Sequence, residues 1–277
     1  MNRNLSRLLL LTVISAGAGL AVWQLGGNPP KTAPQQQAAM PPAKKQTPRL
    51  PVIEVQPVLD NWNASQTGKA SVVVYDLENK KTVGSLLPDE QYFTASIYKL
   101  YVAYFGYQKI ADGTHDFNQP YVSGYSRGQC LDAMIRSSFS PCAEKMWVEL
   151  GKQNLTDRLR AYGLTDTSLV GLYTSAKDAA LILQRLFERR DLGEDHTSLF
   201  LESLKTQDPK YRKGLPQGFQ NSTVYNKVGY NGQVEYHDAA IVSLKNGRHY
   251  AVTILTERIG TNNIIALSKA IEATLSR

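Results

Sequence analysis

Hydrophobic and polar residues alternate along the chain in patterns that predict a helix, a hairpin and a second helix at the start of its globular part. A helix is predicted over residues 52–66, followed by strands over 71–76 and 82–86 around the turn 79–81. Apolar residues then recur at helical spacing over 97–111, which predicts a second helix.

The middle of the chain has mostly helical patterns to about residue 207. Four helices are predicted, over residues 130–138, 141–150, 156–162 and 175–188. Pro141 is typical of a first helical residue, and Ser140 before it is expected to cap that helix.

Strand patterns return near the end of the chain. Three runs rich in Val, Ile, Ala and Tyr, at 222–228, 234–244 and 249–255, are separated by the hairpin signals Asn-Gly at 231–232 and 246–247. A helix over 262–275 closes the chain. We therefore expect an α/β (α+β) fold: one antiparallel sheet from both chain ends, flanked by helices, with an inserted all-helical lobe and a cleft between the lobes.

The first 52 residues differ in composition from the rest. An apolar run at 8–25 follows Arg3 and Arg7, which is typical of an uncleaved signal anchor or of a signal peptide cut near the small residues 16–21. The anchor is the preferred interpretation because the run extends past these small residues through Val22 and Trp23 without a polar break. We assign residues 1–27 to this segment, 28–52 to a flexible linker rich in Pro, Gln and Ala, and 53–277 to the folded domain.

The basic charge of the chain lies mainly in this N-terminal region. Its first 50 residues contain six Lys or Arg residues and no acidic residue, so the remaining 25 cations and 24 acids give a formal charge of +1. A nearly neutral domain argues against nucleic-acid binding, and the basic tail is expected beside a membrane. The folded domain is expected outside the cytoplasm.

Both cysteines, Cys130 and Cys142, lie in the helical block. In an oxidising compartment a disulfide between them would stabilise the fold by about 3 kcal/mol. The alternative is two buried free thiols. No metal-ligand spacing surrounds them, and no metal or cofactor is expected.

Candidate chemistry begins at Ser96 and Lys99, in the sequence Ser-Ile-Tyr-Lys at the start of the second predicted helix. Residues three apart share a helix face, so the Lys99 amine can reach toward the Ser96 hydroxyl. A lysine acts as a base only when burial or a second cation lowers its pKa, and Lys227 is a candidate for that cation. Alone, a Ser-x-x-Lys pattern occurs by chance in a chain of this length.

Two further short segments complete the pattern. Ser138, in Ser-Phe-Ser between two predicted helices, is placed to relay a proton to a leaving group. Lys227-Val228-Gly229 ends a predicted strand, where the lysine can hold a substrate carboxylate or polarise Ser138. Gly229 is expected to let a substrate backbone approach closely.

In their order and spacing, these three segments resemble the motifs of the penicillin-recognising serine hydrolases, which comprise the class A beta-lactamases and the D,D-peptidases known as penicillin-binding proteins. The resemblance covers about residues 52–277. It implies the two-lobed fold and the following roles, carried by matched positions: Ser96 as nucleophile, Lys99 as its base partner, Ser138 as proton relay, Ser140, Lys227 and Gly229 as substrate contacts, and the N–H groups of Ser96 and Tyr230 as oxyanion hole.

The chain departs from the family pattern at three places. Ser140 stands where the family has Asn, and Val228 stands where it has Thr or Ser. A lost hydrogen bond to a charged group is worth about 1.5–3 kcal/mol, so we expect weaker beta-lactam binding. The loop 165–173, where class A enzymes carry a deacylating Glu, contains Asp166 but no Glu. Slow deacylation is therefore expected.

Other ionisable residues are expected to have structural or solvent-exposed positions. His237 and Asp238 lie on a predicted strand, where a core or rim role is favoured over catalysis. Glu144 follows Cys142 on a predicted helix and is expected to be solvated.

The sequence thus predicts an exported, membrane-tethered serine hydrolase that a beta-lactam or a D-alanyl peptide of the cell wall acylates. An alternative is a catalytically weak or inactive module of the same fold that binds cell-wall peptides. A weaker alternative is an esterase for small acyl esters. The sequence leaves the oligomeric state open.

Overall fold

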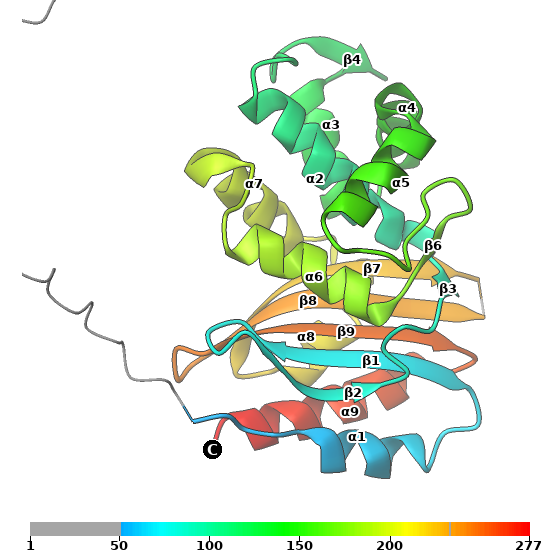
Figure 1. Ribbon diagram of the computed structural model, residues 1–277, viewed down its shortest axis with the longest axis vertical. Coiled ribbons are helices and arrows are strands. Elements are labelled where there is room, and N and C mark those ends of the chain that lie inside the picture. Colours follow the sequence, from blue (N-terminus) through cyan, green and yellow to red (C-terminus); the bar gives the residue numbers. More distant parts are fainter. Residues whose placement is uncertain (1–50, 233) are drawn as a thin grey trace, which may run out of the picture. The chain divides into compact units, whose positions relative to one another are not determined.

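Both ends of the folded part contribute strands to one antiparallel sheet, in the order β2-β1-β9-β8-β7 (Figure 1). The computed structural model describes residues 51–232 and 234–277. The strands of this sheet are β1 (Lys69–Asp76), β2 (Lys81–Leu86), β7 (Ser222–Asn231), β8 (Glu235–Leu244) and β9 (His249–Glu257). The predicted sheet, with strands from both chain ends, is confirmed.

The central strands are apolar on both faces because helices cover both sides. Strand β9 is buried from Tyr250 to Thr256, and its register pairs Val73 of β1 with Thr253. Strand β8 pairs with β9 on one side and with β7 on the other. This leaves β7 as an edge strand, whose outer side faces the segment that contains Ser96.

One face of the sheet packs against the terminal helices. These helices are α1 (Gln56–Asn63), α8 (Leu215–Gly218) and α9 (Thr261–Leu275). Their apolar side chains, among them Leu59 and Leu267, form a core with Val72, Val74 and Val252 of the sheet. The first helix begins four residues later than predicted, at Gln56, and has Pro57 in its first turn, where the missing N–H costs nothing.

The other face of the sheet packs against the helical lobe (Figure 1). Its helices are α2 (Tyr98–Ala111), α3 (Arg127–Arg136), α4 (Ser140–Leu150), α5 (Lys152–Ala161), α6 (Ala176–Phe187) and α7 (Gly193–Lys205). Helix α2 is buried on every side from Tyr98 to Tyr107, so it is the central helix of this lobe. The sequence prediction placed the first five of these helices and gave no bounds for α7.

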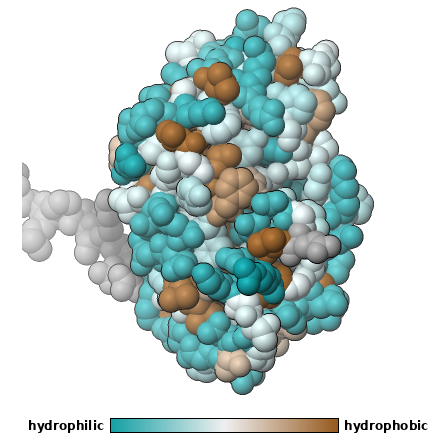
Figure 2. All heavy atoms as spheres, turned by 90° about the vertical axis from the view of Figure 1, so that its right-hand side faces the viewer, coloured by the Kyte–Doolittle hydropathy of each residue, from teal (hydrophilic) through white to brown (hydrophobic). Residues whose placement is uncertain are grey.

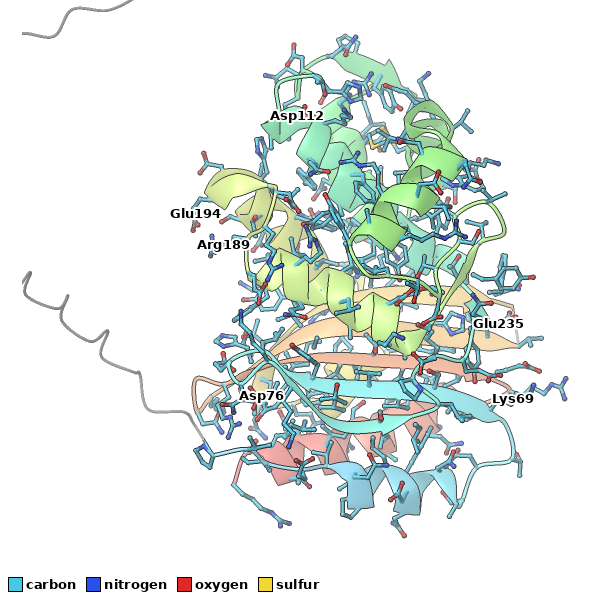
Figure 3. All side chains as sticks on the ribbon, viewed as in Figure 1. Lys69, Asp76, Asp112, Arg189, Glu194 and Glu235 are labelled. Carbon is cyan, nitrogen blue, oxygen red and sulfur yellow. A yellow bond between two sulfur atoms is a disulfide. The ribbon has the colours of Figure 1, made fainter. Side chains whose placement is uncertain are left out.

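Charged side chains lie mostly on the outside of the folded part, as Figure 3 shows for Asp112, Glu194 and Arg189. One buried ion pair lies at the end of β1, where Asp76 accepts a 2.6 Å hydrogen bond from Arg248 and both side chains are almost fully buried. This pair joins the β1–β2 hairpin to the start of β9.

The predicted membrane segment 1–27 and nearly all of the predicted linker 28–52 lie outside the described residues. In the part of the chain that the structure describes, no helix has the length and apolar character needed to cross a membrane.

Candidate active site

Ser96 lies in a short 3-10 helix, η1 (Ala95–Ile97), between the two-residue strand β3 (Tyr92–Phe93) and the central helix α2. Ala95 has a φ of 42°, a left-handed conformation that is costly for a residue with a side chain. Its neighbours fix this turn, because Ile97 is buried and the N–H of Thr94 donates to the carbonyl of Leu172. The Ser96 side chain is half-buried at the start of a rigid helix.

Strand β7 approaches this turn closely, and Gly229 makes the approach possible. A Cβ at position 229 would lie 2.8 Å from the carbonyl oxygen of Thr94 and 2.9 Å from the side chain of Ile97. From the sequence, this glycine was predicted to let a substrate backbone approach. The structure shows instead that the space at Gly229 is filled by the backbone that carries Ser96.

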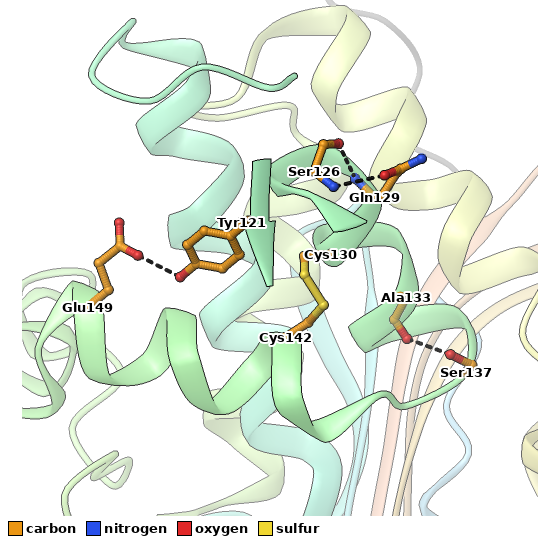
Figure 4. The surroundings of a disulfide bond; sticks show 8 residues. All are labelled: Tyr121, Ser126, Gln129, Cys130, Ala133, Ser137, Cys142 and Glu149. Carbon is orange, nitrogen blue, oxygen red and sulfur yellow. Dashed lines mark hydrogen bonds between the residues drawn. A yellow bond between two sulfur atoms is a disulfide. The ribbon is translucent and has the colours of Figure 1, made fainter. Parts of the chain in front are cut away.

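Ser138 lies in the tight connection between α3 and α4. Cys130 and Cys142, one on each helix, form a disulfide that joins the two helices beside this connection (Figure 4). The predicted disulfide is confirmed, and both cysteines are buried. Ser138 has a φ of 55°, again in the left-handed region, while Ser137 donates from its hydroxyl to the carbonyl of Ala133. The disulfide and these local contacts hold the connection in one conformation.

The hydroxyl of Ser138 lies between two lysines. Lys99 Nζ and Lys227 Nζ each lie 3.2 Å from Ser138 Oγ. Lys99 also donates to the Ser138 carbonyl at 2.6 Å and to Ser140 Oγ at 3.0 Å. Helix α4 begins at Ser140, and Phe139 is its N-cap residue, so the predicted capping role of Ser140 is wrong. The Ser140 hydroxyl instead accepts a hydrogen bond from Lys99. The three sequence segments meet at one place.

Both lysines are buried, and burial favours their neutral forms. Lys99 is 2% exposed, and burial lowers its pKa to about 8, while the negative charge of Glu144 partly offsets this effect. Lys227 is 0% exposed, and burial together with the neighbouring Lys99 lowers its pKa to about 7. A lysine with such a pKa can accept a proton near neutral pH.

A pocket of about 600 Å³ opens in front of Ser96 and Lys99. Its other lining residues are Phe93, Ala95, Tyr98, Ser140, Glu144, Trp147, Val148, Leu172, Tyr230 and Asn231. Figure 2 views the side of the molecule on which β3 and β6 (Tyr173–Thr174) lie in Figure 1, and hydrophobic residues gather near the middle of that face. The pocket therefore combines a serine and a lysine with mainly apolar and aromatic walls.

In the described part of the chain, the Ser96 hydroxyl makes no hydrogen bond to Lys99 or to any other residue. Lys99 Nζ instead uses its three bonds on the Ser138 carbonyl, Ser138 Oγ and Ser140 Oγ. Hydrogen bonds between catalytic groups are often long before substrate binds and shorten in the complex.

A second pocket, of about 310 Å³, lies against the outer end of β7. It shares Tyr230 with the first pocket and is also lined by Val228, and Lys210 and Lys213 provide positive charge. The resemblance implied that Lys227 binds the substrate carboxylate, but its amine is buried and lines neither of these pockets.

In the loop 165–173, the position at which class A enzymes carry a deacylating Glu, the acidic side chain points away from Ser96 toward other partners. Asp166 pairs with Lys177 at 3.0 Å, and its N–H donates to Asp178. Of this loop, only Leu172 lines the pocket in front of Ser96.

His237 and Asp238 are fully buried in β8 behind the site, in agreement with the expected core role. His237 contacts the carbonyl of Phe93 through Nε2 at 2.8 Å, and burial lowers its pKa to about 4, so it is neutral. Asp238 accepts from the N–H of Leu215 and from the amide of Asn226, which precedes Lys227. Burial raises the pKa of Asp238 to about 7. Both residues support the strands that carry the site.

Sequence reasoning missed several pocket residues. Glu144 was expected to be solvated; its side chain is exposed, but it lines the pocket with Ser96. The spacing of Ser140, Glu144 and Trp147 along one helix is the signal by which they were recognisable as one face. Among the described residues, no group of three or more His, Cys, Asp or Glu side chains is placed to hold a metal ion.

Comparison with known proteins agrees with this geometry. The model of a family described as the beta-lactamase enzyme family matches residues 54–275. None of the curated protein sequences matches the chain significantly. Among solved structures, PBP-A superposes with a TM-score of 0.73 at 16% identity, covering 82% of this chain and 98% of that chain.

Two beta-lactamases, one of them a class A enzyme, give similar agreement in fold. The reconstructed enzyme of the last common ancestor of Gram-negative bacteria has a TM-score of 0.72 at 17% identity, covering 79% of this chain and 98% of that chain. A beta-lactamase from Desulfarculus baarsii has a TM-score of 0.71 at 18% identity, covering 80% and 97%. The chain therefore belongs to the beta-lactamase enzyme family, and it is a serine hydrolase of the type that acts on amide bonds.

Proposed function

We propose that this protein is an exported, membrane-tethered hydrolase that is acylated at Ser96 by the amide of a beta-lactam or of a D-alanyl peptide from the cell wall. The observation that carries the proposal is the Ser138 hydroxyl, which lies 3.2 Å from the amines of both Lys99 and Lys227 beside the pocket of Ser96. A hydroxyl between two buried lysines is suited to move a proton.

Acylation starts when neutral Lys99 accepts the proton of Ser96 Oγ. The oxygen then attacks the carbonyl carbon of the substrate amide and forms a tetrahedral intermediate. The N–H groups of Ser96 and Tyr230 are the proposed donors to its oxyanion, since both residues line the pocket and β7 is an edge strand.

Collapse of this intermediate breaks the carbon–nitrogen bond. Ser138 gives its proton to the leaving nitrogen and recovers one from Lys99, which returns to the neutral form. The contact of Lys227 with Ser138 Oγ supports this role, because a hydrogen bond donated by the Lys227 amine stabilises the negative charge that develops on the oxygen when Ser138 gives up its proton.

Recognition of the substrate carboxylate is proposed to depend on more than Lys227. The amine of Lys227 is buried, and Val228 offers no hydroxyl. Lys210 and Lys213 line the adjoining pocket and supply the exposed positive charge. Loss of the usual hydroxyl contact is worth about 1.5–3 kcal/mol, so affinity for beta-lactams is expected to be low.

Penicillin is a suitable first probe. A mutant of PBP-A, 16% identical to this chain, was solved as an acyl-enzyme complex with penicillin G. Incubation of the full chain with penicillin G should increase its intact mass by one penicillin. The Ser96→Ala variant should show no increase, and a persistent adduct in this variant would exclude Ser96 as the nucleophile.

The alternative of a peptide-binding module without turnover is favoured by Ser140 and Val228 and by the missing contact between Ser96 and Lys99. It predicts that wall-peptide binding, measured by calorimetry, survives in Ser96→Ala, and that wild-type protein forms no adduct with penicillin or any chromogenic ester. An adduct on Ser96 would exclude this alternative.

The membrane tether is proposed from the apolar run at 8–25. After expression in a bacterial host, the full chain should stay in the membrane fraction through a high-salt wash, while a variant without residues 1–27 should not. Recovery of the full chain in soluble form, with a shortened N-terminus, would instead identify a cleaved signal peptide.

A further inference from the structure

Glu144 supplies the one carboxylate among the described residues that line the Ser96 pocket. It lies on α4, one turn after Ser140, and Trp147 and Val148 continue the same helix face one turn later. Its negative charge acts on Lys99 and on the phenol of Tyr98, which are the titratable groups of α2 on this side. The Glu144 carboxylate therefore faces the space between Ser96 and solvent.

The Glu144 carboxylate is free to bind water. It makes no hydrogen bond or ion pair within the part of the chain that the structure describes, and its side chain is exposed. Asp166, the carboxylate of the loop opposite, is instead engaged by Lys177 at 3.0 Å. Lys99 is also engaged, by its three contacts with Ser138 and Ser140.

We propose that Glu144 is the general base that activates water for hydrolysis of the acyl group on Ser96. This inference rests on the proposed function, because it concerns the second half of the same reaction. It places the base on helix α4, two residues after Cys142, and not on the loop 165–173.

In the proposed step, a water held by Glu144 loses a proton to the carboxylate while its oxygen attacks the ester carbonyl of the acyl-enzyme. The tetrahedral intermediate collapses, and the bond between the carbonyl carbon and Ser96 Oγ breaks. The proton on Glu144 passes, directly or through Lys99, to Ser96 Oγ. The product leaves as a carboxylic acid, and the enzyme regains its starting protonation.

The test compares acylation and deacylation in the full-length wild type and in Glu144→Gln, which keeps the shape of the side chain and removes its basicity. Both proteins are incubated with penicillin G, excess ligand is removed, and loss of the adduct is followed by intact mass. We expect acylation within about threefold of the wild type. General base catalysis contributes about 10²–10⁴ in rate, so deacylation should slow by about 100-fold.

Asp166→Asn serves as the matched variant, since it removes the loop carboxylate. Its adduct should be lost at the wild-type rate. Equal adduct lifetimes in the wild type and in Glu144→Gln would overturn the role of Glu144, as would slow deacylation confined to Asp166→Asn. Thermal melting of each variant verifies that it is folded.

The test also separates two other cases. In one, Glu144 only binds substrate; in the other, the protein is not acylated at all. If Glu144 only bound a cation of the substrate, Glu144→Gln would slow acylation by ampicillin, which carries an ammonium group, more than acylation by penicillin G, and would leave deacylation unchanged. That result would overturn the proposal. Absence of any adduct in the wild type would overturn the proposed function itself, whereas an adduct with an unchanged lifetime in Glu144→Gln would overturn only the inference.

Discussion

At the scale of single residues, the site is defined by two lysines that the fold holds in an apolar environment. Lys99 and Lys227 have pKa values lowered to about 8 and about 7, chiefly by burial. Burying a charge costs free energy, and the mutual repulsion of two nearby ammonium groups adds to that cost. The arrangement that makes Lys99 a usable base therefore weakens the folded state.

This cost makes stability depend on pH in a defined direction. Between about pH 7 and pH 10, the unfolded chain keeps a proton on Lys227 that the folded chain has lost, so the free energy of unfolding should rise with pH. Lys227→Met should be more stable than the wild type near pH 7. The free energy of unfolding of Lys227→Met should rise less steeply with pH than that of the wild type, by as much as about 1.4 kcal/mol per pH unit.

Urea unfolding at pH 7 and at pH 9 measures this difference. The exposed Lys269→Met is the control and should keep the wild-type slope. Identical slopes for Lys227→Met and the wild type would show that Lys227 keeps an ordinary pKa in the folded protein.

At the scale of elements, the site depends on how β7, η1 and the α3–α4 connection are held together. Gly229 lets β7 lie against the turn of Ser96, and the disulfide between Cys130 and Cys142 joins the helices that flank Ser138. Each contact positions a reactive side chain without touching substrate.

Replacement of Gly229 by alanine should separate β7 from η1. The added methyl group would lie 2.8 Å from the Thr94 carbonyl, which belongs to the backbone and cannot move aside as a side chain can. We expect penicillin acylation to slow by at least about 100-fold, since misplacement by about 1 Å can cost that much. Gly260→Ala, where nothing lies within 4 Å of the added methyl, should react normally. Normal acylation of Gly229→Ala would contradict the packing role.

Removal of the disulfide should affect both stability and the position of Ser138. The double variant Cys130→Ala/Cys142→Ala should lose about 2–4 kcal/mol of unfolding free energy, because its unfolded state is no longer constrained. Denaturant titration measures the loss. Acylation should also slow, since the α3–α4 connection is less firmly held. A double variant with reduced stability but unchanged acylation would show that the disulfide stabilises the fold and does not position Ser138.

At the scale of the whole molecule, the helical lobe and the sheet are parts of one packed body. The described residues belong to one compact unit, and the core of the helical lobe includes Val73, Ile241 and Leu255 from the sheet. Helix α2 runs through this core, and its first residues carry the site. The site should therefore be lost only when the whole domain unfolds.

Two of the three tryptophans allow this to be measured once Trp23, in the N-terminal region, is replaced by Phe in every protein compared. Trp62 packs in the core beneath the sheet, and Trp147 lies on α4 in the helical lobe. Fluorescence of Trp62→Phe and of Trp147→Phe should in each case report a single unfolding transition. The two transitions should coincide once any change in stability caused by the substitutions, measured by circular dichroism, is taken into account. Separate transitions from the two reporters would show that the lobes unfold independently.

Local patterns in the sequence were sufficient for most of the fold. Alternation over the terminal strands, the Asn-Gly turns and the helical spacing from residue 97 onward predicted the sheet and most helices, because each signal acts within a few residues. The motif residues Ser96, Lys99, Ser138 and Lys227 were also recognisable by order and spacing. The start of α1 was misplaced, since Pro57 favours the first turn of a helix over its interior.

Only the tertiary structure decided how these residues are used. In the folded protein, the Ser140 hydroxyl accepts a hydrogen bond from Lys99 and does not cap α4. The backbone of Thr94 lies against Gly229, and Asp166 pairs with Lys177. The fold also brings Glu144 to the pocket of Ser96. The sequence by itself determined which elements form and which reactive groups are present. Distances between groups far apart in the chain, and the burial that lowers the pKa values of the two lysines, arise only when the lobes pack together.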